Sequence, residues 1–164
     1  MKKVLVVMGS DSDLKVMEKC VDRLKSFDIP TEVRICSAHR TPAVAEQLAK
    51  NAAAEGFGVI IAAAGKAAHL GGVLAAYTTL PVIGVPMATS VMGGMDSLLS
   101  TVQMPPGFPV ATVAADKAGA RNSAWLAAQM LALSDPALAE KIAAARKKMQ
   151  QDIEKAAAEL SARY

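Results

Sequence analysis

Short runs of apolar residues alternate along this chain with longer segments in which apolar positions recur every three or four residues. The first run, Val4 to Met8, is continuously apolar, which is typical of a strand covered on both faces. The next segment carries apolar residues at helical spacing, namely Leu14, Met17, Val21 and Leu24. Pro30 then indicates where this helix has ended.

The same alternation continues to residue 133. It predicts further strands at Thr31 to Ile35, Val59 to Ala63, Val82 to Val85 and Val110 to Val113. It predicts further helices at Pro42 to Glu55, roughly His69 to Thr78, Met95 to Gln103 and Gly119 to Leu133. Strands that alternate with helices pair in parallel through right-handed crossovers. We therefore expect an α/β fold, a three-layer doubly wound parallel sheet of the flavodoxin-like order 2-1-3-4-5.

The expected strand order also indicates where a ligand binds. Ligands of such sheets lie beyond the carboxyl ends of the strands, near the point where the strand order reverses, here between the first and third strands. The candidate loops are those after Met8, Ile35, Ala63 and Val85. At 164 residues the chain fits one domain, so we look for a single site.

The pattern changes at Asp135-Pro136 to one long helix with a single apolar stripe. The stripe consists of Leu138, Ile142, Ala145, Met149, Ile153, Ala156 and Leu160. A helix of about 25 residues runs roughly 37 Å, which is longer than a domain of this size can easily cover. We expect residues 1–134 to form the α/β catalytic domain and residues 135–164 a C-terminal helix of the same domain that packs on a neighbouring subunit. The alternative is a helix that folds back on its own domain.

Composition and charge argue against several other functions. Hydrophobic residues make up 52% of the chain, much of the excess being alanine, which favours a helix-rich body. The net charge is only +3, and the basic residues crowd into the last third without interleaved aromatics, so nucleic-acid binding is not indicated. No apolar run approaches the ~18 residues of a membrane helix, and a strand pattern begins at Val4 without a signal peptide's apolar core. We expect a cytoplasmic protein that contacts neither nucleic acid nor membrane.

The two cysteines, Cys20 and Cys36, are too few to suggest a disulfide framework, so we expect reduced and largely buried thiols. Cys36 and His39 have the spacing of two zinc ligands. The only other histidine is His69, and no second pair of cysteines completes a tetrahedral site. We therefore expect no structural metal.

The first candidate loop, Gly9 to Asp13, follows a buried strand and opens a helix. Backbone N–H groups at a helix start favour an anion, so this loop is expected to bind a phosphate or a ribose. It lacks the lysine of a nucleoside-triphosphate loop and the glycine spacing of a dinucleotide loop. The alternative is simple capping of the helix by Ser12 or Asp13.

The second and third loops each bring a histidine to the same edge of the sheet. In the second, Ser37 to Pro42, Arg40 can fork onto phosphate, and His39 has the side chain whose unperturbed pKa, about 6.5, suits proton transfer. The third, Ala64 to Gly72, is rich in small residues that permit close approach to a ligand, and its His69 either lines the site or caps its helix. The methionine-lined run Val91 to Ser97 is expected to form either an apolar wall of the pocket or ordinary core.

Several motifs that occur together in order carry a resemblance to a known family. They are Met8-Gly9-Ser10-x-Ser12-Asp13, Ser37-Ala38-His39-Arg40-Thr41-Pro42, Ala67-Ala68-His69-Leu70, Gly84-Val85-Pro86, Asp96-Ser97-Leu98, Val102-Gln103-Met104-Pro105 and Lys117-Ala118-Gly119-Ala120. Up to about Leu133 the chain resembles the N5-carboxyaminoimidazole ribonucleotide mutases of purine biosynthesis.

The resemblance implies isomerisation of N5-carboxyaminoimidazole ribonucleotide to 4-carboxy-5-aminoimidazole ribonucleotide, by loss and recapture of carbon dioxide in a closed site. It implies no ATP, metal or organic cofactor, and a homo-octamer. By position, His39 would take the proton from the imidazole carbon and return it. The substrate-binding set would be Ser10, Ser12, Asp13, Ser37, Arg40, Gly65, Lys66, His69 and Leu70.

The third loop departs from the family pattern. Bacterial mutases usually have Gly-Gly-Ala-Ala-His-Leu-Pro-Gly there, whereas this chain has Lys66 and Gly71. A related branch, the class II aminoimidazole ribonucleotide carboxylases, uses free carbon dioxide and tends to carry arginine at the position of Lys66. If this chain belonged to that branch, Lys66 would be expected to bind the incoming carboxylate. His69 and the His39-Arg40 pair favour the mutase.

Other classes of protein fit the sequence less well. A response-regulator receiver would need an aspartate after the third strand, where this chain has Ala64-Gly65. A flavin-binding module would usually present aromatic rings, and aromatic residues make up only 4% of the chain. A non-catalytic nucleotide-binding subunit is the alternative that stays open.

Overall fold

The computed structural model describes residues 1–88 and 92–164. Its centre is a five-stranded parallel sheet in the order β2-β1-β3-β4-β5, which confirms the expected fold class. The strands are β1 (Lys3–Met8), β2 (Thr31–Ile35), β3 (Phe57–Gly65), β4 (Val82–Met87) and β5 (Ala111–Thr112). The helices are α1 (Leu14–Ser26), α2 (Pro42–Asn51), α3 (Leu70–Tyr77), α4 (Met95–Val102), α5 (Asp116–Ala132) and α6 (Pro136–Ser161). Short 3-10 helices, η1 (Asp11–Asp13) and η2 (Met92–Gly94), precede α1 and α4.

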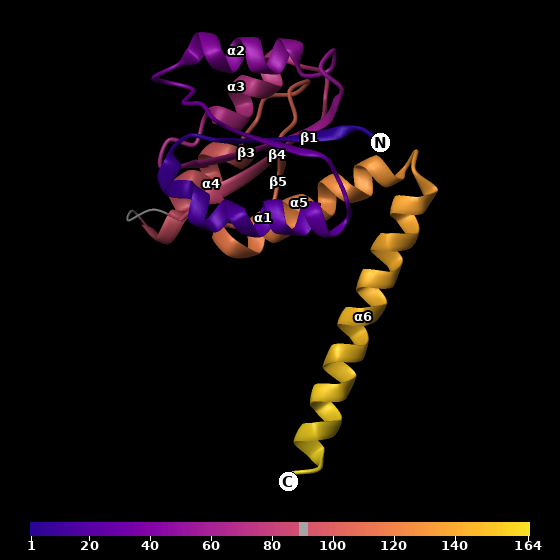
Figure 1. The fold of residues 1–164 in the computed structure, drawn as a ribbon. Helices are drawn as coiled ribbons and strands as arrows, with labels where there is room; N and C mark the ends of the chain where they lie inside the picture. Colours follow the sequence, from indigo (N-terminus) through magenta and orange to yellow (C-terminus); the bar gives the residue numbers. More distant parts are fainter. Residues whose placement is uncertain (89–91) are drawn as a thin grey trace.

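Helices cover both faces of the sheet, with α2 and α3 on one face and α1 and α5 on the other (Figure 1). The central strand β1 reflects this arrangement residue by residue. Val4, Val6 and Met8 pack in the core with α1 and α5, whereas Leu5 and Val7 pack in the core with α2 and α3. Successive side chains of a strand point to opposite faces, so a strand between two helical layers is apolar throughout.

Small residues let α5 lie close to the rest of the domain. A Cβ atom at Gly119 would lie 1.6 Å from the carbonyl oxygen of Ala114, which only glycine avoids. The following turns bury Ala120, Ala124 and Ala127 completely. The alanine content of the chain therefore serves close helix packing, as the composition suggested.

Some element boundaries differ from those predicted. Helix α2 ends at Asn51 rather than at Glu55, because the chain turns there into β3. Gly56 has a φ of 89°, and the amide of Phe57 donates to the carbonyl of Ala52 over 3.0 Å. The edge strand β5 has two residues rather than the four expected.

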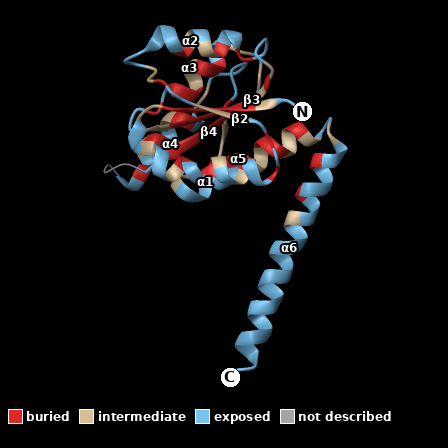
Figure 2. Ribbon diagram, in the orientation of Figure 1, coloured by how far each residue is buried: buried red, intermediate tan, exposed pale blue. Residues whose placement is uncertain are grey.

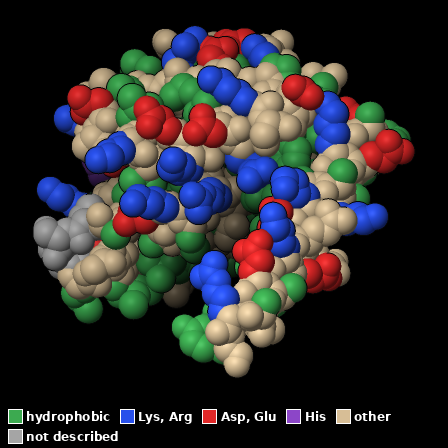
Figure 3. Space-filling model, turned by 60° about the horizontal axis from the view of Figure 1, so that its bottom comes forward, with side chains coloured by type: hydrophobic (Ala, Val, Ile, Leu, Met, Phe, Trp, Pro, Cys, Tyr) green, Lys and Arg blue, Asp and Glu red, His purple; other side chains and the backbone are tan. Residues whose placement is uncertain are grey.

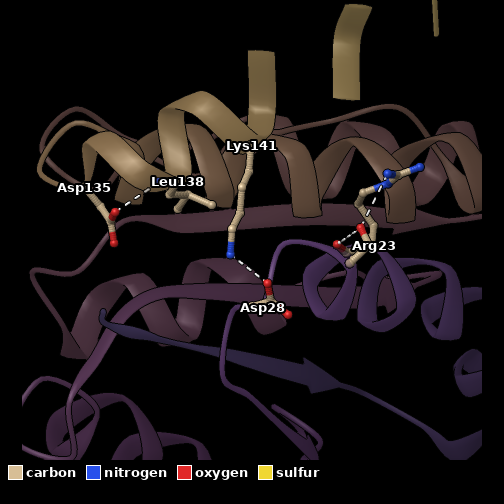
Figure 4. Close-up of polar contacts among 6 residues, drawn as sticks. Arg23, Asp28, Asp135, Leu138 and Lys141 are labelled. Atoms are coloured by element: carbon tan, nitrogen blue, oxygen red, sulfur yellow. Dashed lines mark hydrogen bonds and ion pairs between the residues drawn. The ribbon is translucent and has the colours of Figure 1, made fainter. Parts of the chain in front are cut away.

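The start of α6 belongs to the core of the domain. The side chain of Asp135 caps the helix by accepting a hydrogen bond from the amide of Leu138 at 3.0 Å, and Lys141 forms an ion pair of 2.7 Å with Asp28 (Figure 4). Leu138 is fully buried, and Ile142 is 8% exposed. The first two turns of α6 are thus fixed to the loop that follows α1.

Beyond those turns α6 projects away from the body of the domain (Figure 1), and its residues are exposed almost throughout (Figure 2). Met149, Ile153 and Leu160, which continue the predicted apolar stripe, are 55%, 72% and 59% exposed. The alternative of a helix folded back on its own domain is therefore wrong.

The surface of the domain carries charges of both signs, and both cysteines are buried. Basic and acidic side chains are intermixed over the face drawn in Figure 3. No helix in the described part of the chain has the length and apolarity to cross a membrane. Cys20 and Cys36 are free and buried, as expected, and burial raises the pKa of the Cys20 thiol to about 12.

Candidate active site

The loops after β1, β2 and β3 meet at the carboxyl edge of the sheet, and the fourth candidate loop, after β4, lies partly outside the described residues. The register pairs Met8 of β1 with Ile35 of β2 and with Ala63 of β3, so the loops after these strands begin side by side. Backbone hydrogen bonds continue the pairing past the strand ends, from Cys36 to the Met8 carbonyl (2.8 Å) and from Gly9 to the Ala63 carbonyl (3.0 Å). These loops enclose a cavity of about 570 Å³. Its lining is Gly9, Ser10, Ser12, Asp13, Ser37, Ala38, His39, Arg40, Ala64, Gly65, Lys66, Ala67 and Leu70.

All but one of the predicted site residues line this cavity. The exception is His69, which reaches it through a contact with His39. The expected apolar wall did not form as predicted. Met92 and Met95 are 77% and 43% exposed and are not among the described residues of the lining, while Val91 lies outside the described residues.

The loop after β1 is organised by Ser10. Its hydroxyl oxygen accepts hydrogen bonds from the amide of Ser12 (3.3 Å) and from the hydroxyl of Ser12 (3.0 Å), which caps η1. Asp13 stands at the N-cap position of α1 but makes no capping hydrogen bond. The alternative of simple capping by Ser12 or Asp13 is therefore wrong, and Asp13 lines the cavity.

The environment of Asp13 disfavours its charged form. Partial burial is the largest influence and raises the pKa of the carboxyl group, and the nearby Asp11 and Asp116 raise it further. Hydrogen bonds from Ser12 and Ser10 oppose the shift without cancelling it. Hydrogen bonds from a ligand's hydroxyl groups, or a nearby cation, would therefore stabilise the ionised carboxylate of Asp13.

Arg40 joins the second loop to the first. Its Nη2 donates to the carbonyl of Gly9 (3.0 Å), and its Nε donates to the hydroxyl of Ser37 (3.4 Å). The same hydroxyl accepts from the backbone amide of Arg40 (3.2 Å). These bonds hold the guanidinium group beside the loop of Ser10, where the remaining N–H groups can bind an anion.

The two histidines of the chain form a hydrogen-bonded pair. Nε2 of His39 lies 2.9 Å from Nδ1 of His69, and the rings meet edge to face with centroids 5.0 Å apart. One of these two nitrogens must donate and the other accept, so the hydrogen bond links the tautomer of one ring to that of the other. His69 occupies the N-cap position of α3 but makes no capping hydrogen bond, so the capping alternative is wrong for this residue.

Sequence reasoning did not identify Asp116, which follows the fifth strand. Its φ is 55°, and its Oδ1 accepts a hydrogen bond of 2.7 Å from the amide of Ala88, just after β4. Asp116 thus ties the end of β4 to the start of α5 and contributes negative charge near Asp13. Its position as an acidic residue after a predicted strand is the feature that could have identified it from the sequence.

A second cavity, of about 890 Å³, lies at the opposite end of the sheet, between the ends of α2 and α3 and the segment before β5. Its described lining includes Lys50, Tyr77 and Phe108 but no histidine and no carboxylate. The cavity at the carboxyl edge combines a histidine pair, a carboxyl group, an arginine and hydroxyl groups. It can therefore bind an anionic ligand and move a proton. Among the described residues no group of three His, Cys, Asp or Glu side chains is placed to hold a metal ion.

Comparisons with known proteins give one consistent result. Residues 3–152 match the model of a family described as AIR carboxylase. A protein of Pyrococcus abyssi named N5-carboxyaminoimidazole ribonucleotide mutase is 50% identical over 94% of this chain and 86% of its own length. The protein of the same name from Bacillus subtilis is 49% identical over 90% of this chain and 91% of its own length.

Solved structures agree with the sequence relatives. A crystal structure of Treponema denticola PurE has a TM-score of 0.87 and 29% identity, and the match covers 96% of this chain and 97% of that one. A 3-dehydroquinate dehydratase-like protein from Bifidobacterium longum, at 18% identity and a TM-score of 0.53, shares the fold alone.

Proposed function

The chain belongs to the AIR carboxylase family, and we propose that it isomerises N5-carboxyaminoimidazole ribonucleotide to 4-carboxy-5-aminoimidazole ribonucleotide in purine biosynthesis. Relatives about half identical over some nine tenths of the chain bear the name of this mutase, so the chain is an enzyme. The observation that carries the proposal is the pairing of His39 with His69, 2.9 Å apart, beside a cavity that also holds Arg40 and Asp13.

The site offers separate regions for the two ends of such a substrate. The hydroxyl groups of Ser10 and Ser12 and the guanidinium group of Arg40 lie together and suit the phosphate. Asp13 lies in the same loop and can accept hydrogen bonds from the ribose hydroxyls. The imidazole of the substrate would then extend toward His39 and the third loop, where Gly65 and Leu70 contribute to the wall.

The reaction needs one proton to change place. The bond between the exocyclic nitrogen and the carboxylate carbon breaks, carbon dioxide is released, and the nitrogen keeps the electron pair and gains a proton. The ring carbon then attacks carbon dioxide and loses its proton. His39 can accept that proton and return it, so the sum is a transfer of one carboxylate in one direction and one proton in the other. No ATP, metal or organic cofactor enters this balance.

The hydrogen bond to His69 gives His39 a defined orientation for this task. An isolated exposed imidazole would sample several rotamers, whereas a bond between Nε2 and Nδ1 restricts the ring of His39. Positioning of this kind contributes to rate because misplaced groups lose much of their effectiveness. His69 therefore acts on the reaction through its contact with His39.

A mutase must also retain the carbon dioxide that it releases. In the single chain His39, Arg40 and Lys66 are exposed, so the cavity is open on that side. We infer that neighbouring subunits of a homo-octamer cover it. The exposed stripe of α6 and a second exposed apolar row on η2 and α4, formed by Met92, Met95, Leu99 and Val102, supply apolar surface for such an assembly. We place the enzyme in the cytosol, with a ribonucleotide as its small-molecule ligand.

Turnover by the purified chain tests the proposal. The carbamate substrate, added without ATP or metal, should be converted to the carboxylated product, followed by the disappearance of the ring C–H signal in proton NMR. The outcome that contradicts the proposal is binding of the substrate without conversion, which would describe a non-catalytic nucleotide-binding subunit. A class II carboxylase would instead use aminoimidazole ribonucleotide and free carbon dioxide.

A further inference from the structure

Lys66 stands out among the residues that line the candidate active site. The charged members of the described lining are Asp13, Arg40 and Lys66. Arg40 is bonded to Gly9 and to Ser37, and Asp13 is bonded to Ser12. Lys66 forms no ion pair with any carboxylate in the part of the chain that the structure describes. It is thus a cation at the cavity whose counter-ion is not supplied by these residues.

The backbone of Lys66 adopts a conformation that a glycine would adopt with less strain. Its φ is 55°, in the left-handed region, where a side chain beyond glycine is disfavoured. The hydroxyl of Ser100 donates to the carbonyl of Lys66 over 3.1 Å and so ties this turn to α4. A lysine held in a strained turn at a cavity is a reason to ask what its side chain binds.

The order of the strands places Lys66 and Arg40 on opposite sides of the phosphate-and-ribose loop. Arg40 follows β2, and Lys66 follows β3, while β1 and the Ser10 loop lie between them. Adjacent strands are about 4.8 Å apart, so the two loops begin roughly 10 Å from one another. A carboxylated ribonucleotide carries its phosphate and its carboxylate at opposite ends, and the site offers one cation at each side.

We propose that Lys66 is a specificity-determining residue that binds the carboxylate of the ribonucleotide and so distinguishes carboxylated ligands from the decarboxylated one. The inference rests on the proposed function, because it takes the ligand from it. It assigns the phosphate to Arg40 and the carboxylate to Lys66, in the third loop, which also carries His69. The positive charge of Lys66 also offsets the negative charge that Asp13 and the ligand bring to the same cavity.

Two ligands that differ only in the carboxylate test this assignment. They are 4-carboxy-5-aminoimidazole ribonucleotide and 5-aminoimidazole ribonucleotide, titrated by calorimetry into the full chain. Lys66→Met removes the charge and keeps the length of the side chain. It should weaken binding of the carboxylated ligand by about 10- to 100-fold and change binding of the other by no more than about threefold, as loss of one charge-assisted hydrogen bond predicts.

Three variants serve as controls. Lys66→Arg should keep the preference for the carboxylated ligand. Lys66→Gly should lose this preference as Lys66→Met does. It should also raise the Tm, because glycine adopts the left-handed backbone of this position with less strain. If Lys66→Met does not fold, Lys66→Gly takes its place in the test. Arg40→Ala should weaken the binding of both ligands to the same extent, since both carry the phosphate.

The inference is overturned if Lys66→Met and Lys66→Gly weaken both ligands equally or weaken neither. Its failure can be told apart from failure of the proposed function. If the unaltered chain converts the carbamate substrate but the Lys66 variants show no discrimination, only the role of Lys66 is wrong. If the chain prefers the carboxylated ligand in a Lys66-dependent way but converts nothing, the proposed reaction is wrong and the role of Lys66 stands.

Discussion

Nε2 of His39 lies 2.9 Å from Nδ1 of His69, although the two residues are 30 positions apart in the chain. The first histidine follows β2 and the second follows β3, and the strand order brings both to one edge of the sheet. Taken alone, each loop presents one exposed histidine. Their contact creates a pair in which one ring donates a hydrogen bond to the other.

Replacement of His39 by asparagine should remove proton transfer and preserve ligand binding. Asparagine keeps polarity and approximate size but cannot accept and return a proton at neutral pH. We expect kcat to fall by at least about 10²- to 10⁴-fold, with the Kd for the ribonucleotide product within about threefold of the original. A His39→Asn variant that lost affinity but turned over bound substrate normally would contradict the division of roles.

Arg40 should act on binding. Arg40→Lys keeps the charge but loses the fork that bonds both Gly9 and Ser37, so it should weaken the phosphorylated ligand less than Arg40→Ala does. For Arg40→Ala we expect a loss of about 10- to 100-fold in affinity. Titration with the corresponding unphosphorylated riboside is the control, because its affinity should not respond to either variant. Equal losses of affinity for the nucleotide and the riboside would show that the guanidinium group does not bind the phosphate.

The order of the elements was largely accessible from the sequence, because it depends on local patterns. The continuous apolar run Val4 to Met8 and the periodic helices that follow require a sheet covered on both faces, and the strand order follows from parallel crossovers. Boundaries were less accessible where a turn competed with a helix. The end of α2 depends on the left-handed Gly56 and on the bond between Phe57 and Ala52, which periodicity does not report.

The candidate residues were also accessible, but their contacts were not. The positions of His39 and His69 after strands indicate that both lie at one edge, yet their hydrogen bond depends on side-chain directions in two separate loops. Ser10, rather than Ser12 or Asp13, caps the first helical turn, because the backbone of Ser10 is extended as a capping residue requires, whereas that of Asp13 is already helical. Asp116 was missed because its partner is the backbone amide of Ala88, which no sequence motif reveals.

Asp13 should make stability depend on pH in a predictable direction. Its pKa is raised above the ordinary value of 3.8, chiefly by burial, so the ionised carboxylate disfavours the folded state. The folded chain binds more protons than the unfolded chain between 3.8 and the raised pKa, and stability from this group therefore decreases as pH rises through that window. Asp13→Asn should raise the Tm at neutral pH by a few degrees and should weaken ligand binding.

The advantage of Asp13→Asn should shrink as the pH falls toward 3.8, when Asp13 itself becomes protonated. Asp22→Asn, at an exposed position of α1, is the matched control and should leave the Tm nearly unchanged. Thermal unfolding followed by circular dichroism across this range measures both. A lower Tm for Asp13→Asn at neutral pH would show that the carboxylate stabilises the fold.

The projecting part of α6 should determine the size of the assembly. Removal of residues 149–164 takes away the exposed apolar stripe but keeps Leu138 and Ile142 in the core, whereas a cut before Asp135 would remove these as well. Each apolar side chain buried at an interface contributes about 1.5–3 kcal/mol. Light scattering should therefore give smaller particles for the shortened chain.

A pair of substitutions separates the stripe from the rest of the helix. Ile153→Glu places a charge on the stripe and should also reduce particle mass, whereas Gln151→Glu, on the opposite side of the helix, should not. An unchanged mass for both the shortened chain and Ile153→Glu would remove α6 from the interface.

The origin of the transferred carboxylate tests the central claim most directly. A mutase must recapture the carbon dioxide that it releases before the gas is diluted in solvent, and confinement can supply effective molarities of about 10⁵–10⁸ M. Carbamate substrate labelled with carbon-13 in its carboxylate is converted in a single turnover in the presence of excess unlabelled bicarbonate, and the product is analysed by mass spectrometry. We predict that the product retains the label. Loss of most of the label, together with efficient carboxylation of aminoimidazole ribonucleotide at low dissolved carbon dioxide, would contradict the mutase and assign the chain to the carboxylases that use free carbon dioxide.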